Sequence, residues 1–404
     1  MVAPPSAVTA PHAGAKTVLA VFTLLLAVTQ LLWLNFAPLV GLVCKRYAVS
    51  ELAATMLVLV FPLIYVLLSI PAGVLVDRRG YRFTVGWGGI VTAAFATLRI
   101  WDDHFAVLLV AQIGIALAQP FVMNGISKLV ADWFSEEHGA IATGVGTMGM
   151  FIGMAVAMAV TPGLVASTSL RTAMVVFAIV SWSSAGLFWM FGRERATTPA
   201  VPSRPAASVR ELVAQRDLRI LFALSFLGLG FFNALMTWIE PILAPNGFDA
   251  EVAGTVGGVL IGGGIVGSIV IPALSDRARR RKPFLIGCAL LALGLVHPLC
   301  TTNRQGSAYG LSAALGFFLL PAFALLLEMC SEHAGREHAG NATGLLMLMG
   351  NAGGVVMSLL VELVRGDSGS YLNAVWMLNG SLIVMIGLAV ILREHARQPG
   401  SGNT

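Results

Sequence analysis

The chain has 404 residues, of which 57% are hydrophobic and only 11% are charged. Charged residues make up about 25% of an ordinary soluble domain, so this composition excludes one and indicates a protein that crosses a membrane many times. The formal net charge of +5 points first to membrane topology, because Lys and Arg concentrate on the cytoplasmic side of membrane proteins. We therefore expect a lipid bilayer, and not nucleic acid, as the partner of this chain.

The four cysteines stand singly in or beside apolar stretches, at Cys44, Cys288, Cys300 and Cys330. Their spacing fits neither a metal site nor a disulfide framework, so we interpret them as small core residues. The segment before Lys16 is rich in Ala and Pro and lacks the pattern of a secretory signal. The first apolar stretch is therefore predicted to be retained as a span.

Twelve apolar stretches have about 20 residues or more, the length that crosses a bilayer. The first six predicted spans are 17–44, 52–76, 82–101, 104–130, 138–162 and 170–192. The second six are 218–244, 250–275, 283–301, 306–330, 337–363 and 370–393. We predict an all-α integral membrane protein with one six-helix bundle in 1–192 and a second, with a short cytoplasmic tail, in 218–404. The segment 193–217 is rich in Pro, Ala, Ser and Arg and predicts a cytoplasmic linker, with a short surface helix at 208–215.

Basic residues define the expected orientation. Of the 25 Lys and Arg residues, 19 fall on the side of the two chain termini when twelve spans are threaded through a bilayer. The positive-inside rule then predicts that both termini are cytoplasmic in a plasma or inner membrane.

The two predicted bundles share short sequence patterns. The Glu-His-x-x-x-Ala-Thr-Gly pattern of 137–144 recurs at 337–344, and the Glu-x-Ala-x-Thr pattern of 51–55 recurs at 251–255, both with an offset of 200 residues. Spans two and eight, and spans five and eleven, are thereby placed in register. Because each bundle has six spans, both begin on the same side of the membrane, which predicts a parallel repeat.

The turn between spans two and three has a distinctive composition: Gly73, Asp77, Arg78, Gly80 and Arg82. Small residues let two helix ends approach, basic residues mark the cytoplasmic side, and an acid can dock against a helix N-terminus. This pattern resembles the corresponding loop of major facilitator superfamily (MFS) transporters. The alternative is a basic cytoplasmic turn in another polytopic membrane protein.

The resemblance implies two six-helix bundles, a substrate site near mid-membrane between them, and access that alternates between the two sides. It also implies that Asp77 docks at the cytoplasmic N-terminus of span eleven, near 337–340, when the inner side is closed. The related pair Asp276 and Arg277 in the second bundle lacks the glycine spacing, so we do not expect the two turns to be equivalent.

Glycines recur at short intervals in two predicted spans. They are Gly144, Gly146, Gly149 and Gly153 in span five, and Gly258, Gly262 and Gly267 in span eight. Small residues of this kind let helix backbones approach closely. The spacing is consistent with a sliding contact between the bundles and equally with ordinary helix packing.

The chain lacks a motif for covalent chemistry. The glycine run 262–264 is not followed by the Lys-Ser/Thr of a phosphate-binding loop, and His, Cys and Asp show no metal-ligand spacing. His297 stands alone in a peripheral span and is interpreted as a histidine at a helix interface. We expect a protein that is not an enzyme and that uses no cofactor and no metal.

Polar side chains within the spans are candidates for the substrate site, because such groups are costly in a membrane and tend to face a cavity or a helix partner. These candidates are Gln30, Trp33, Asn35, Gln112, Gln119, Asn124, Asn233, Trp238 and Asn351. Each is equally able to form a hydrogen bond between helices. Among three acids in apolar stretches, Glu240 is the best candidate for a cation partner or proton-coupling site. We expect Glu328 to pair with a cytoplasmic base, and Glu362 to be an interfacial charge.

A narrower resemblance covers about 130 residues. It includes Trp33, the turn at 71–83, Ala-Gln-Pro-Phe at 118–121, Ser-x-x-x-Ala-Asp-Trp-Phe at 127–134 and the glycine-rich stretch 149–162. This order of features is similar to the FLVCR-related (feline leukaemia virus subgroup C receptor) branch of haem and choline transporters.

In that branch a span-one tryptophan and a span-four glutamine help to hold a choline-like cation, which implies this role for Trp33 and Gln119. A span-eleven glutamine of the branch falls on Asn351. The branch's span-seven tyrosine has no counterpart here, where Leu235 or Trp238 is nearby. Two other positions differ from drug/proton antiporters of the superfamily. Those proteins carry an arginine in span four where this chain has Leu109, and a Gly-Pro pair in span five where it has Gly149-Met150. Both differences count against proton-coupled drug export, which stays open as an alternative.

We therefore predict a monomeric secondary transporter that moves a small organic solute by alternating access, with a choline- or ethanolamine-like cation as the candidate substrate. The predicted substrate site consists of Trp33, Gln119, Asn233, Asn351, Trp238 and Glu240. One alternative is a proton-coupled exporter of drugs or metabolites. Another is a membrane sensor that binds its ligand without transporting it.

Overall fold

The computed structural model describes residues 14–195, 209–335, 338–365 and 370–394, and the regular elements in these ranges are helices. Eleven helical stretches among them are long and apolar enough to cross a membrane. The remaining predicted span forms α4 (Tyr81–Leu98), which is less apolar because it contains Arg82 and three glycines. The predicted all-α membrane fold is confirmed, and α4 supplies the twelfth long helix.

The elements before the linker form the first half of the molecule. They are α1 (Ala15–Leu34), η1 (Ala37–Leu39), α2 (Val40–Tyr47), α3 (Glu51–Arg79), α4, α5 (Phe105–Met123), α6 (Gly125–Trp133), α7 (Glu136–Ser167) and α8 (Leu170–Phe191). Two predicted spans are broken helices: α1, η1 and α2 together make the first, and α5 and α6 make the fourth.

The elements after the linker form the second half. They are α10 (Arg216–Leu243), η2 (Ala244–Asn246), α11 (Ala250–Ala278), α12 (Lys282–Thr301), α13 (Gln305–Ala334), α14 (Ala339–Arg365) and α15 (Leu372–Ile391). The short helix α9 (Val209–Ala214) precedes them where the sequence predicted a helix at 208–215, and its Leu212 is buried. The linker residues 196–208 lie outside the described part of the chain.

The two halves repeat the same arrangement of helices. In the first half α1 packs on α7, α3 and α4 pack on α5, and α4 packs on α8. In the second half α10 packs on α14, α11 and α12 pack on α13, and α12 packs on α15. These pairs correspond one to one when the second half is counted from α10, as the parallel repeat in the sequence predicted.

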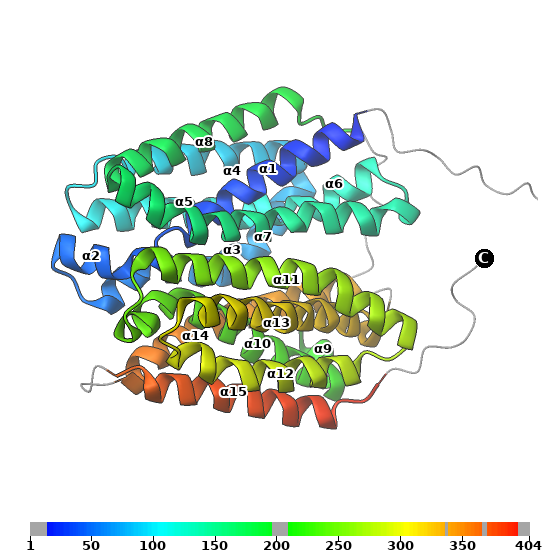
Figure 1. The fold of residues 1–404 in the computed structure, drawn as a ribbon. Helices are drawn as coiled ribbons and strands as arrows, with labels where there is room; N and C mark the ends of the chain where they lie inside the picture. Colours follow the sequence, from blue (N-terminus) through cyan, green and yellow to red (C-terminus); the bar gives the residue numbers. More distant parts are fainter. Residues whose placement is uncertain (1–13, 196–208, 336–337, 366–369, 395–404) are drawn as a thin grey trace, which may run out of the picture.

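All the long helices run roughly along one direction and define two ends of the molecule (Figure 1). We call the end where α1 begins and α15 ends the terminal end, on the right of Figure 1. The opposite end, where α2 ends and α3 begins, is the distal end. Between the halves, α7 packs on α11 and α3 packs on α14.

Glycines hold helices together mainly within each half. A Cβ at Gly153 of α7 would overlap the carbonyl oxygen of Ala27 on α1, and a Cβ at Gly353 of α14 would overlap that of Phe226 on α10. Only backbones without side chains can approach so closely. Of the glycines noted in the sequence, Gly258 lies against α7 in the other half.

Candidate functional site

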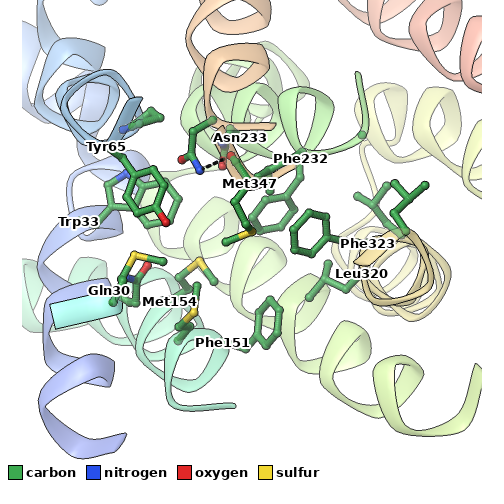
Figure 2. Close-up of a pocket in the computed structure, with 18 of the residues that line it drawn as sticks. Gln30, Trp33, Tyr65, Phe151, Met154, Phe232, Asn233, Leu320, Phe323 and Met347 are labelled. Carbon is green, nitrogen blue, oxygen red and sulfur yellow. Dashed lines mark hydrogen bonds between the residues drawn. The ribbon is translucent and has the colours of Figure 1, made fainter. Parts of the chain in front are cut away.

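A cavity of about 90 Å³ lies between the two halves. Its wall is formed by α1, α3, α5 and α7 of the first half and by α10, α13, α14 and α15 of the second. Figure 2 shows side chains from both halves converging on this space. We call it the central cavity.

Four of the six predicted substrate-site residues line the central cavity: Trp33, Gln119, Asn233 and Asn351. The indole of Trp33 is anchored to α3, because its N–H donates a hydrogen bond to the carbonyl oxygen of Val58 at 3.1 Å. Its ring also packs against Phe61, with 6.3 Å between the ring centroids. The indole therefore has a fixed orientation at the cavity wall.

Two amides of the cavity wall have unused hydrogen-bonding groups. Gln30 on α1 and Asn233 on α10 are 0% and 3% exposed, and neither the oxygen nor the nitrogen of either amide has a partner in the described structure. A buried amide without partners costs about 1–3 kcal/mol. A polar ligand in the cavity would remove that cost, which makes these side chains the strongest sign of a binding site. Asn351 is different, because its amide donates to the carbonyl oxygen of Met347 at 3.0 Å.

The rest of the wall is aromatic and methionine-rich. Tyr65, Phe151, Phe232 and Phe323 contribute rings, and Met123, Met150, Met154, Met347 and Met385 contribute flexible thioethers. None of these aromatic residues was predicted from the sequence to line a substrate site. Tyr65 could have been found, because it is the one tyrosine in the second predicted span.

The structure places the other two predicted residues, Trp238 and Glu240, away from the central cavity. Trp238 is fully buried, donates from its indole N–H to the carbonyl oxygen of Ser358 at 3.0 Å, and packs on Tyr371. Glu240 accepts a hydrogen bond from the backbone N–H of Gly41 at 3.0 Å, near the distal end.

The contact of Glu240 with Gly41 belongs to a set of bonds that joins the two halves at the distal end. Glu51, at the start of α3, accepts hydrogen bonds from Arg365 at the end of α14 and from the hydroxyl of Tyr371. We call the residues Gly41, Glu51, Glu240, Arg365 and Tyr371 the distal latch. A Cβ at Gly41 would lie 2.7 Å from a carboxylate oxygen of Glu240, so a larger residue there would require the carboxylate to move.

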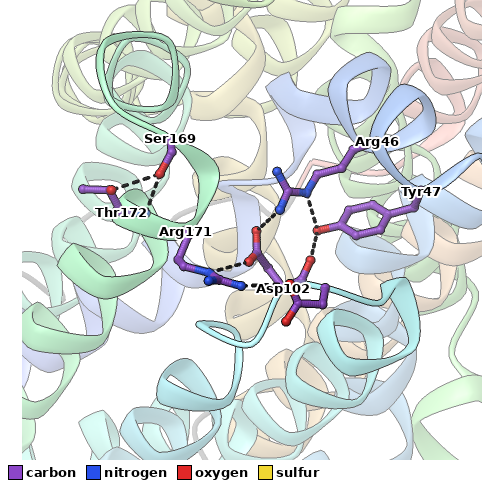
Figure 3. Close-up of polar contacts among 7 residues, drawn as sticks. Arg46, Tyr47, Asp102, Ser169, Arg171 and Thr172 are labelled. Atoms are coloured by element: carbon purple, nitrogen blue, oxygen red, sulfur yellow. Dashed lines mark hydrogen bonds and ion pairs between the residues drawn. The ribbon is translucent and has the colours of Figure 1, made fainter.

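A second network fixes α2 to the rest of the first half (Figure 3). The Asp102 carboxylate is completely buried and forms ion pairs with Arg46 of α2 at 2.7 Å and Arg171 of α8 at 3.0 Å. The hydroxyl of Tyr47 donates to the backbone carbonyl of Asp102 at 2.7 Å. Gly41, on α2, therefore belongs to the first half, and its bond to Glu240 of α10 is a contact between the two halves.

The residues of the turn motif lie at the terminal end. Gly80 has a φ of 83° between α3 and α4, a conformation that favours glycine. Arg82 lies over the ring of Trp189, 5.8 Å from the centroid. Gly73 faces Asn124, and Asp77 and Arg78 are exposed. Of the predicted docking region of Asp77, 337–340, only Glu337 lies outside the described residues. The Asp77 carboxylate forms no hydrogen bond or ion pair with the described residues 338–340, at the start of α14.

The remaining polar candidates have structural roles. Gln112 bridges the backbone of Leu57 and the buried Arg99. Arg99 also reaches Asn35, and Asn124 donates to Ser69. Glu328 pairs with Arg281 and Glu362 with Arg365.

No group of three or more His, Cys, Asp or Glu side chains that could hold a metal ion occurs in the described ranges. His297 packs against Trp376, with 4.9 Å between the ring centroids.

A repeated six-helix architecture with a cavity between its halves defines a class of membrane transporters. The family model described as Major Facilitator Superfamily matches residues 22–358, and the chain belongs to this family. It is therefore a multi-pass membrane transporter and not an enzyme.

Named relatives and a solved structure agree with this assignment. The chain is 23% identical to the choline/ethanolamine transporter flvcr2a of Danio rerio, over 92% of this chain and 86% of the relative. It is 26% identical to solute carrier family 49 member A3 of Xenopus tropicalis, over 85% of this chain and 77% of the relative. Its fold is similar to that of a bacterial homologue of the human lysosomal transporter Spinster, crystallised in an inward-facing, occupied conformation. The TM-score is 0.73 at 15% identity, over 95% of this chain and 96% of the other.

Proposed function

We propose that this transporter carries a small organic cation with one hydrogen-bonding group, of which choline and ethanolamine are the candidates. The observation that supports this most is the composition of the central cavity. Its wall combines aromatic rings with unpartnered amides, and the lining residues, all in the described part of the chain, include no acidic side chain.

Such a wall suits a bulky, weakly hydrated cation. An aromatic face attracts a desolvated quaternary ammonium by about 2 kcal/mol, and Trp33 and Tyr65 are the electron-rich rings at this wall. The amides of Gln30 and Asn233 can accept or donate to a hydroxyl or amine of the same ligand. Two relatives, from Danio rerio and Felis catus, are named as choline/ethanolamine transporters, which supports the same substrate class.

Alternating access is the proposed mechanism. The distal latch and the close approach of Gly258 to Ala159 of α7 join the halves toward the distal end, whereas Asp77 at the terminal end is exposed. We propose that both termini are cytoplasmic, in keeping with the excess of basic residues on that side. The structure then corresponds to an inward-facing state, and opening of the latch would expose the cavity to the other side.

Proteoliposome transport tests the substrate. Purified protein reconstituted into vesicles should exchange radiolabelled choline or ethanolamine for internal unlabelled substrate without an imposed pH gradient. Exchange should be absent from vesicles without protein. No exchange of either compound, with or without a pH gradient, would remove this substrate class.

A proton-coupled exporter of drugs or metabolites is the second candidate. Two observations favour it: five methionines in the cavity wall can adapt to varied apolar ligands, and Glu240 is a buried carboxylate between the halves. The same vesicles test this candidate with lipophilic dyes. Dye uptake that requires a pH gradient, and that Glu240→Gln abolishes, would support it over choline exchange.

A further inference from the structure

A second hollow lies on the outer flank of the second half, away from the central cavity. It is an apolar groove of about 210 Å³ between α11, α12 and α13. Its lining residues are Ile271, Pro283, Phe284, Gly287, Cys288, Leu291 and Phe318. We call it the α12 groove.

The α12 groove opens on a surface that faces lipid. Leu291 at its edge is 49% exposed, and its neighbours Leu290 and Leu274 are 52% and 42% exposed. Gly287 lines the groove, and a Cβ at this position would meet no atom within 4 Å. The missing side chain therefore leaves open space that an apolar chain can fill.

A basic loop adjoins the terminal end of the same groove. Arg277, Arg279 and Arg280 are exposed and form no ion pair with any described residue. Pro283 in the groove wall is three positions after Arg280, which is at most about 11 Å of chain. The backbone of this arginine-bearing loop thus lies next to the wall of an apolar groove.

The other basic residues of this loop, Arg281 and Lys282, bond to groups within the protein. Arg281 pairs with Asp276, Glu328 and Glu332, and Lys282 donates to the carbonyl oxygens of Val390 and Leu392. The Glu394 carboxylate accepts from the backbone N–H of Arg281 at 2.8 Å. These bonds fasten the loop to α13 and α15 and leave the three exposed arginines for an external partner.

Arg279 is also unexpected for the backbone that it occupies. Its φ is 53°, and it ends α11 in the left-handed conformation, where glycine is ordinarily favoured. The local fold alone therefore does not explain an arginine at this position.

We propose that the α12 groove and Arg277, Arg279 and Arg280 form a binding site for an anionic phospholipid. One acyl chain lies in the groove beside Gly287, and the headgroup phosphate is bound by the arginines. Basic clusters between membrane helices recognise anionic headgroups in this way. The site is separate from the central cavity and does not depend on the proposed substrate.

Native mass spectrometry of the detergent-purified protein tests the proposal. Palmitoyl-oleoyl phosphatidylglycerol should bind at least fivefold more tightly than phosphatidylcholine with the same acyl chains. Gly287→Leu should fill the groove and weaken phosphatidylglycerol binding at least tenfold. Gly294→Leu is the matched control. Gly294 lies on the same helix and also has open space around its Cα, but it does not line the groove. Phosphatidylglycerol binding by this variant should stay within twofold of wild type.

The headgroup contact is tested separately by Arg279→Gln combined with Arg280→Gln, which should remove the preference for phosphatidylglycerol over phosphatidylcholine. A monodisperse gel-filtration peak shows that each variant is folded. Equal binding by Gly287→Leu and Gly294→Leu would overturn the groove, and an unchanged headgroup preference in the arginine variant would overturn the headgroup site. Two further results would also overturn the proposal. The first is full competition of inorganic phosphate with the lipid. The second is a dimer mass that Gly287→Leu abolishes, because the groove would then be an interface between two copies of the chain.

Discussion

Three residues of the central cavity present to a ligand the groups that they do not use within the described structure. Trp33 uses its N–H on Val58, which leaves its ring as the feature that a ligand can contact. Gln30 and Asn233 leave both groups of their amides free among the described residues. The cavity therefore offers an aromatic ring from the first half and unbonded amides from both halves.

Trp33→Ala should weaken binding of choline at least tenfold, equivalent to about 1.4 kcal/mol. The physical reason is the loss of the aromatic face that attracts the ammonium group. Isothermal titration calorimetry of purified protein measures the change. Trp33→Phe, which keeps a ring, should lose less affinity than Trp33→Ala, and equal affinity in wild type and Trp33→Ala would remove this residue from the site.

Asn233→Leu should weaken choline binding by about 1 kcal/mol, the net value of one hydrogen bond. Tetramethylammonium, which has no hydroxyl group, should bind wild type and variant alike. Competition binding with the two cations distinguishes a specific hydrogen bond from general damage to the cavity. Equal losses for both cations would contradict a hydrogen bond from Asn233 to the hydroxyl.

Very close helix packing occurs within each half at two positions that are 200 residues apart in the sequence. Gly153 meets α1 and Gly353 meets α10 with no space for a side chain. Each half is therefore closely packed within itself, while its main contacts with the other half are between α7 and α11 and between α3 and α14. A substitution that separates α1 from α7 should disturb the first half itself and not only the contact between halves.

Gly153→Ala should destabilise the protein by about 1–3 kcal/mol, because the added methyl group overlaps the backbone of α1. Gly144→Ala on the same helix is the control, since a Cβ there meets no atom within 4 Å. Thermal unfolding in detergent should show a lower midpoint for Gly153→Ala and an unchanged or higher one for Gly144→Ala. Similar midpoints for the two variants would contradict the close packing of α1 and α7.

In the whole molecule, charged residues that could control access to the cavity lie at both ends, and we treat their balance as a prediction. The distal latch ties Glu51 to Arg365 and Tyr371, and Glu240 to Gly41. The family resemblance gives Asp77 a corresponding role at the terminal end, where it is exposed in this structure. We expect the balance between the two ends to set which side of the membrane the cavity faces.

Combining Glu51→Gln with Arg365→Gln should shift the population toward a state open at the distal end, because it weakens the bonds that close that end. Spin-label distances should lengthen across the distal end and shorten across the terminal end. Asp77→Asn should shift the population the other way. Arg304→Gln is the control, since Arg304 is exposed near the distal end and has no ion pair with the described residues. Unchanged spin-label distances in the double variant would show that the distal latch does not govern opening.

The sequence alone determined the membrane class, the approximate extent of the helices and the repeat. These features depend on local composition and length, since a run of about 20 apolar residues must satisfy its backbone within one helix. The sequence also selected Trp33, Gln119, Asn233 and Asn351, because polar groups inside apolar spans are few.

Only the tertiary structure decided which polar residues meet. Trp238 is five positions after Asn233, which turns it about 140° around α10 and away from the central cavity. Glu240 is seven positions after Asn233 and lies on nearly the same face, but about 10 Å nearer the distal end. There it contacts Gly41, as Glu51 contacts Arg365 from 314 positions away. Such pairings depend on how breaks and crossings of helices bring distant segments together, and no local pattern in the chain encodes them.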